Sequence, residues 1–142
     1  MYTSDRSALR RVYVESWQRH CAGLPLEPLQ QQVAEVITLH PEYHALLAAG
    51  EAALQRDWHP QQGEGNPFLH LSLHLAIREQ LAVNRPFGIH ALYRRMVLRW
   101  GGEHPAEHQM IECLEQVLWE AQQQGQAANE EHYLKCLRGR LG

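Results

Sequence analysis

The chain has 142 residues, with 13 Lys and Arg against 16 Asp and Glu, and a formal net charge of −3 at pH 7. A chain of this length can bury about 70% of its unfolded surface, so a core can form without disulfides or metals. The mild negative charge disfavours a surface devoted to nucleic acid or anionic lipid. Histidine is the unusual residue, because the chain holds ten histidines and one lysine. We expect one soluble domain over residues 1–142.

The three cysteines, Cys21, Cys113 and Cys136, lie far apart in the sequence and form no C-x-x-C pair. Such a sparse, odd set is typical of reduced thiols in a cytosolic protein. The first residues carry charges where a signal peptide needs an apolar core, and no stretch approaches the roughly 20 apolar residues of a membrane span. The expected location is therefore the cytoplasm, with no membrane partner.

Apolar residues recur at helical spacing along the whole chain, and no segment alternates as a half-buried strand does. The predicted fold class is all-α, a single compact bundle of about six helices. In chain order the longer helical segments are predicted over residues 4–22, 28–37, 67–84, 89–100, 105–124 and 129–138. Two shorter pieces are predicted at 41–50 and 51–57, and residues 58–65 have the composition of a loop.

Three predicted helices begin in the same way, with the sequences HPEYH, NPFLH and HPAEH at residues 40, 66 and 104. Proline is favoured at the first helical position, and the residue before it is pushed out of the α region. Asn66, His40 and His104 are therefore predicted to be N-cap residues, and His44, His70 and His108 are predicted to lie in first turns. There the positive end of the helix dipole keeps an imidazole neutral, which is the form that binds a metal.

Pairs of histidines four residues apart on a helix project from one face and can share a metal ion. His70 and His74 form one such pair, and they share an apolar stripe that is predicted to face the core. His104 and His108 form another pair, on the border of the apolar face of their helix.

The two helices that carry these pairs are separated by one helix in the sequence. In an up-and-down bundle they would run parallel, so their first turns could meet at one end. Nitrogen and carboxylate ligands without thiolate favour zinc or non-haem iron as the bound ion. The predicted ligands are His70, His74, His104, His108, Glu112 and His44.

Two other interpretations remain open. The paired histidines could be caps and buried hydrogen-bonding residues of a non-catalytic helical interaction or adaptor protein, the structural role that we give to the unpaired His20, His59, His90 and His132. Residues 104–108 also match the H-x-x-E-H pattern of inverted zinc peptidases, with Glu107 as the base of a metal-dependent hydrolase, although such enzymes are much larger. A protein partner or a homodimer is compatible with the sequence, and nucleic acid is disfavoured.

The run NPFLHLSLHLAIREQL at residues 66–81, together with HPEYHALL, EHQMIECLEQVLWEAQ and YLKCLR, resembles a family of small bacterial proteins catalogued as domain of unknown function eighteen-forty-one. The resemblance covers nearly the whole chain, and residues 66–81 are its most specific part. It implies a bacterial cytoplasmic protein that forms a complete domain, and it implies no activity.

Overall fold

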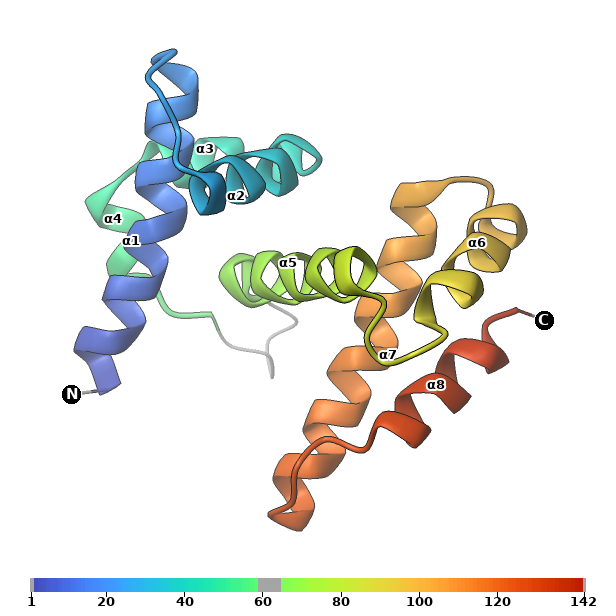
Figure 1. Cartoon of the computed structure of the whole chain (residues 1–142). Coiled ribbons are helices and arrows are strands. Elements are labelled where there is room, and N and C mark those ends of the chain that lie inside the picture. The colour runs from blue at the N-terminus through green and yellow to red at the C-terminus, as the bar shows by residue number, and fades with distance from the viewer. Residues whose placement is uncertain (1, 59–64, 142) are drawn as a thin grey trace. The chain divides into compact units, whose positions relative to one another are not determined.

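The computed structural model describes residues 2–58 and 65–141, and every regular element in these ranges is helical (Figure 1). The predicted all-α class is therefore confirmed. The helices are α1 (Tyr2–Cys21), α2 (Pro28–Thr38), a 3-10 turn (Pro41–Tyr43), α3 (His44–Ala48), α4 (Glu51–Gln55), α5 (Pro67–Val83), α6 (Ile89–Trp100), α7 (Glu103–Gln124) and α8 (Glu130–Gly139).

The predicted number of about six helices is too low for the described residues, which contain eight α-helices. The difference comes from the segment after residue 40, where two short helices, α3 and α4, form on either side of Gly50. Gly50 has a φ of 64°, a left-handed value that ends one helix and begins the next. Most of the predicted loop, residues 59–64 with His59, lies outside the described residues.

The chain divides into two compact units, Met1–Ser72 and Leu73–Gly142, and the boundary falls inside α5. The prediction of a single domain over residues 1–142 stays a prediction. In the N-terminal unit α1 packs against α2, α3 and α4. The buried apolar residues of these four helices are Tyr13, Val14, Trp17, Val33, Ala34, Val36, Ile37, Leu47, Ala53 and Leu54.

In the C-terminal unit α7 packs against α6 and α8. The buried apolar cluster of this unit combines residues from α5 to α8: Leu73, Ile77, Ile89, Met96, Ala106, Met110, Ile111, Cys113, Leu114, Val117, Tyr133 and Leu137. None of the described helices combines the length and the apolar character that crossing a bilayer requires.

A disulfide joins α7 to α8 through Cys113 and Cys136. The expectation of three reduced thiols is therefore wrong for two of them. The physical reason is that the two helices pack together here and bring the Cα atoms to 5.8 Å, inside the range that a disulfide spans. A spacing of 23 residues in the sequence does not reveal this pairing. Cys21 is a free, exposed thiol.

The buried phenol of Tyr133 donates a hydrogen bond to Oε1 of Gln80 at 2.6 Å, and burial raises the pKa of this phenol. Because the folded pKa lies above the unfolded value of about 10, the phenol contributes stability that is complete below that pH and is lost as the pH rises. We expect the unfolding free energy to fall more steeply above about pH 10 in the wild type than in Tyr133→Phe. Urea denaturation followed by circular dichroism measures both slopes, and equal slopes would contradict the prediction.

Candidate metal centre

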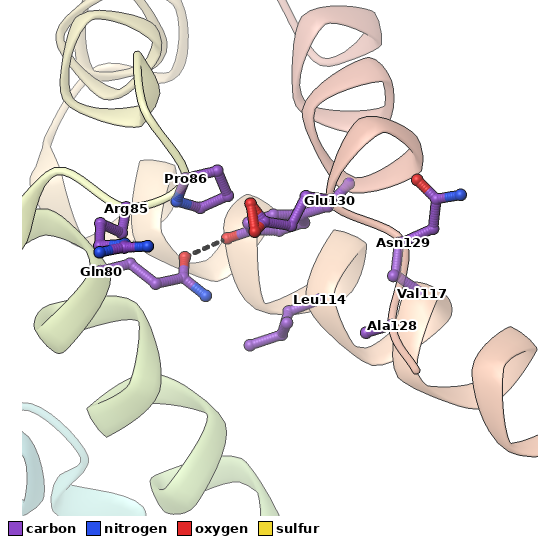
Figure 2. Close-up of a pocket in the computed structure, with 9 residues that line it drawn as sticks. Gln80, Arg85, Pro86, Leu114, Val117, Ala128, Asn129 and Glu130 are labelled. Carbon is purple, nitrogen blue, oxygen red and sulfur yellow. Dashed lines mark hydrogen bonds between the residues drawn. The ribbon is translucent and has the colours of Figure 1, made fainter. Parts of the chain in front are cut away.

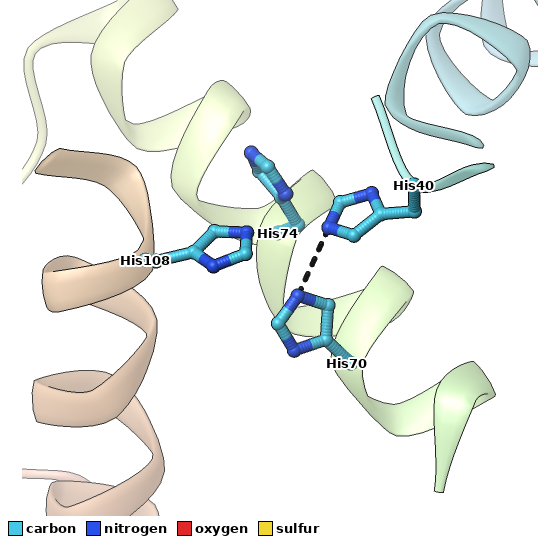
Figure 3. Close-up of side chains that lie close together, drawn as sticks. All are labelled: His40, His70, His74 and His108. Carbon is cyan, nitrogen blue, oxygen red and sulfur yellow. Dashed lines mark hydrogen bonds between the residues drawn. The ribbon is translucent and has the colours of Figure 1, made fainter. Parts of the chain in front are cut away.

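In the N-terminal unit, His40 and His70 form a hydrogen-bonded pair whose Nε2 atoms lie 3.0 Å apart (Figure 3). The other ring nitrogen of His40, Nδ1, lies 2.8 Å from the carbonyl oxygen of Val36. A carbonyl can only accept, so Nδ1 carries the hydrogen and the neutral ring keeps its lone pair on Nε2. In this arrangement Nε2–H of His70 donates to Nε2 of His40.

Local sequence explains how the two rings are placed. His40 precedes Pro41, which forces it out of the α region, so α2 ends and the fully buried His40 side chain turns back over the last turn of that helix. His70 lies in the first turn of α5, behind Pro67. Asn66 caps this turn as predicted, because its Oδ1 accepts from the backbone N–H of Phe68 at 2.9 Å.

His44, a predicted ligand, also lies in the N-terminal unit. Its Nε2 donates to the carbonyl oxygen of Ile37 at 2.9 Å, and its ring packs on Trp17 with centroids 4.3 Å apart. The ring is thus fixed by α1 and α2, and one of its nitrogens is committed to the backbone.

In the C-terminal unit, three histidines from two helices gather. The ring centroid of His74 on α5 lies 5.6 Å from that of His108 and 6.0 Å from that of His104, both on α7. The His104 and His108 rings lie 4.1 Å apart. Because α7 begins at Glu103, two residues before the expected start, His104 lies in its first turn and is not a cap. The prediction that His108 lies in the first turn is wrong for the same reason, because His108 is the sixth residue of α7. Three of the predicted ligands are thus close together in this unit.

Glu107 holds the His74 ring in place. The Nε2 atom of the fully buried His74 lies 2.8 Å from Oε1 of Glu107, a carboxylate that is 2% exposed. Arg78 Nε donates to the same oxygen at 2.6 Å, and the Tyr93 hydroxyl donates to Oε2 at 2.9 Å. Burial alone would raise the pKa of Glu107, but the His74 bond, the Arg78 charge and the Tyr93 bond together hold it below the ordinary value.

This contact decides the tautomer of His74. A carboxylate only accepts, so Nε2 carries the hydrogen and the neutral ring keeps its lone pair on Nδ1. Metal-binding histidines in proteins commonly donate their second N–H to a carboxylate in this way, which fixes the ring and strengthens the ligand nitrogen. With three donors on its two oxygens, Glu107 is an anchor for His74, and the geometry does not support its predicted role as a hydrolytic base.

The carboxylate of Glu112, a predicted ligand, forms an ion pair with Arg140. Its Oε1 accepts from Nη1 of Arg140 at 2.8 Å, and the same guanidinium donates to Gln109 at 2.6 Å. The Glu112 side chain is 58% exposed, and the ion pair links α7 to the end of α8. The structure therefore shows Glu112 in an inter-helix contact of the C-terminal unit.

Two contacts are not predicted from the sequence. His40 is predicted as a cap, and the structure pairs it with His70 in the N-terminal unit. Glu107 is predicted only as a base, and the structure places it against His74 in the C-terminal unit. No sequence signal relates it to His74, because the contact joins α5 to α7 over 33 residues.

A family model described as a domain of unknown function, DUF1841, matches residues 5–139. The chain belongs to this family. The family model covers both units of the DUF1841 chain and all the histidines of the candidate centre. Neither the comparison with curated proteins nor the comparison with solved structures found a match.

Proposed function

We propose that this DUF1841 protein binds one transition metal ion, zinc or iron, in its C-terminal unit, through His74, His104 and His108. The observation that carries the proposal is the hydrogen bond from His74 to the buried carboxylate of Glu107. A histidine that is only a core residue needs a partner for its N–H, and a backbone carbonyl supplies one at little cost. A buried carboxylate costs far more to desolvate, and it is the partner that a metal-binding imidazole needs.

The spacing of the three rings supports the same conclusion. His74 comes from α5, His104 and His108 come from α7, and the ring centroids lie 4.1 Å to 6.0 Å apart. In a tetrahedral site with nitrogens about 2.0–2.1 Å from the metal, two ligand nitrogens lie about 3.4 Å apart. Rings at these separations can turn three nitrogens toward one ion, and three protein ligands leave a fourth position open.

Charge also favours a dication here. Three imidazoles bind in their neutral form, and the helix start that carries His104 is itself positive, so a nearby negative charge is needed to offset the ion. Glu107 supplies that charge from behind His74, and its lowered pKa keeps it ionised at neutral pH.

The remaining predicted ligands, His70, Glu112 and His44, stay predictions outside the proposed set, because each of them has another hydrogen-bond partner. The cytoplasmic location also stays a prediction. The Cys113–Cys136 disulfide weighs against it, since disulfides are rare in that compartment.

Elemental analysis of protein purified without a histidine tag tests the proposal. We expect about one equivalent of zinc or iron per chain in the wild type, and release of protons when the chelated protein is reloaded. His104→Ala and His108→Ala, both at partly exposed positions, should weaken uptake by at least about 100-fold. His90→Ala and His132→Ala are matched controls from the same chain and should bind as the wild type does.

Circular dichroism of each variant shows whether the helices persist, so that loss of metal is not confused with loss of fold. Less than about a tenth of an equivalent of any transition metal in the wild type, with no uptake when zinc or iron(II) is added, would overturn the proposal in favour of an adaptor protein with structural histidines. Normal uptake by His108→Ala would also overturn it.

A further inference from the structure

The C-terminal unit contains a cavity of about 220 Å³ that takes no part in the histidine cluster (Figure 2). It lies where the end of α5 and the turn after it meet the middle of α7 and the start of α8. Leu114 and Val117 from α7, with Pro86 and Ala128, give it an apolar floor. Its volume equals the space of about seven water molecules, well below that of a pocket for a nucleotide or a large cofactor.

One wall of the cavity is a fixed polar contact. Tyr133 donates to Oε1 of Gln80 at 2.6 Å, and Figure 2 shows Gln80 receiving this hydrogen bond. This hydrogen bond joins α8 to the end of α5. Since Tyr133 is 3% exposed, the side of the cavity that Tyr133 and Gln80 form belongs to the buried core of the unit.

Two exposed side chains of opposite charge also line the cavity. Arg85 lies on the turn after α5, and Glu130 lies in the first turn of α8 (Figure 2). Across residues 2–58 and 65–141, neither side chain takes part in any ion pair, although both border the same space. A cation and an anion over an apolar floor are complementary to a ligand that carries both charges and an apolar group.

We infer that this cavity binds a small aliphatic zwitterion, an α-amino acid of about the size of leucine. The ligand carboxylate pairs with the Arg85 guanidinium, the ammonium pairs with Glu130, and the side chain covers Leu114 and Val117. A simple carboxylic acid fits less well, because it would face Glu130 without an ammonium group to offset the charge. A simple amine fits less well because it would face Arg85 without a carboxylate to offset the charge.

Calorimetric titration of the full chain, kept metal-free with a chelator, tests this inference separately from the proposed metal site. The probes are leucine, leucinamide, which lacks the carboxylate, and 4-methylpentanoate, which lacks the amine. We expect leucine to bind at least about tenfold more tightly than either analogue. Arg85→Gln should remove the preference for leucine over leucinamide, and Glu130→Gln should remove the preference over 4-methylpentanoate.

Two neighbouring substitutions serve as controls. Glu131→Gln changes an acid in the same turn that does not line the cavity, and Arg94→Gln changes an exposed arginine on α6; both should leave leucine binding unchanged. Absence of leucine binding up to about 10 mM would overturn the inference, as would tighter binding of either single-charge analogue. Equal losses in the lining variants and in the controls would also overturn it.

Discussion

Replacing Glu107 with alanine is expected to lower the unfolding free energy by about 3–5 kcal/mol at neutral pH. The substitution leaves the N–H of the fully buried His74 and the hydroxyl of Tyr93 without their common acceptor, and water cannot readily replace it. Arg78 is 38% exposed and can turn to solvent, so its share of the loss is smaller. Urea denaturation followed by circular dichroism measures the change.

Controls on the same helix separate this effect from a general loss of helix charge. Glu115→Ala, at an exposed position of α7, should change the unfolding free energy by less than about 0.5 kcal/mol. Tyr93→Phe removes one of the three donors and should cost about 1 kcal/mol. If Glu107→Ala costs no more than Tyr93→Phe, Glu107 does not hold the two helices together as described.

Removing the disulfide is expected to have the next largest effect. The double variant Cys113→Ala with Cys136→Ala should lose about 3 kcal/mol of unfolding free energy, because the cross-link closes a loop of 23 residues in the unfolded chain. Thiol titration in denaturant should find one reactive thiol per chain before reduction and three after it.

Cys21→Ala is the matched control. Cys21 is exposed and unbonded, so its removal should leave the stability unchanged and lower both thiol counts by one. Three reactive thiols in the unreduced protein would contradict the disulfide. A double variant as stable as the wild type would show that the cross-link contributes nothing to folding.

Helix positions were predictable because they depend on neighbours in the sequence. The first turn of α5 illustrates this, since Asn66 and Pro67 mark the start of the helix and the side chain of Asn66 accepts the expected backbone bond. The exact extent of α6, Ile89–Trp100, follows in the same way from the breaks on either side of it.

The partners of the candidate centre were less predictable. A helical wheel shows that His74 faces the core, but it does not show which residue of another helix meets it there. The neighbours found in the structure, Glu107 for His74 and His40 for His70, come from 33 and 30 residues away. The disulfide escaped prediction for the same reason, because Cys113 and Cys136 are related by packing and not by a motif.

The arrangement around Glu107 also limits how this protein can evolve. One carboxylate anchors His74, Arg78 and Tyr93, so almost any substitution there alters the stability of the C-terminal unit together with the basicity of the His74 ring. Selection for weaker or stronger metal binding therefore cannot change the basicity of the His74 ring through Glu107 without also changing the stability of the C-terminal unit. Adaptive change is expected instead at the half-buried His104 and His108, where a new side chain disturbs less of the core.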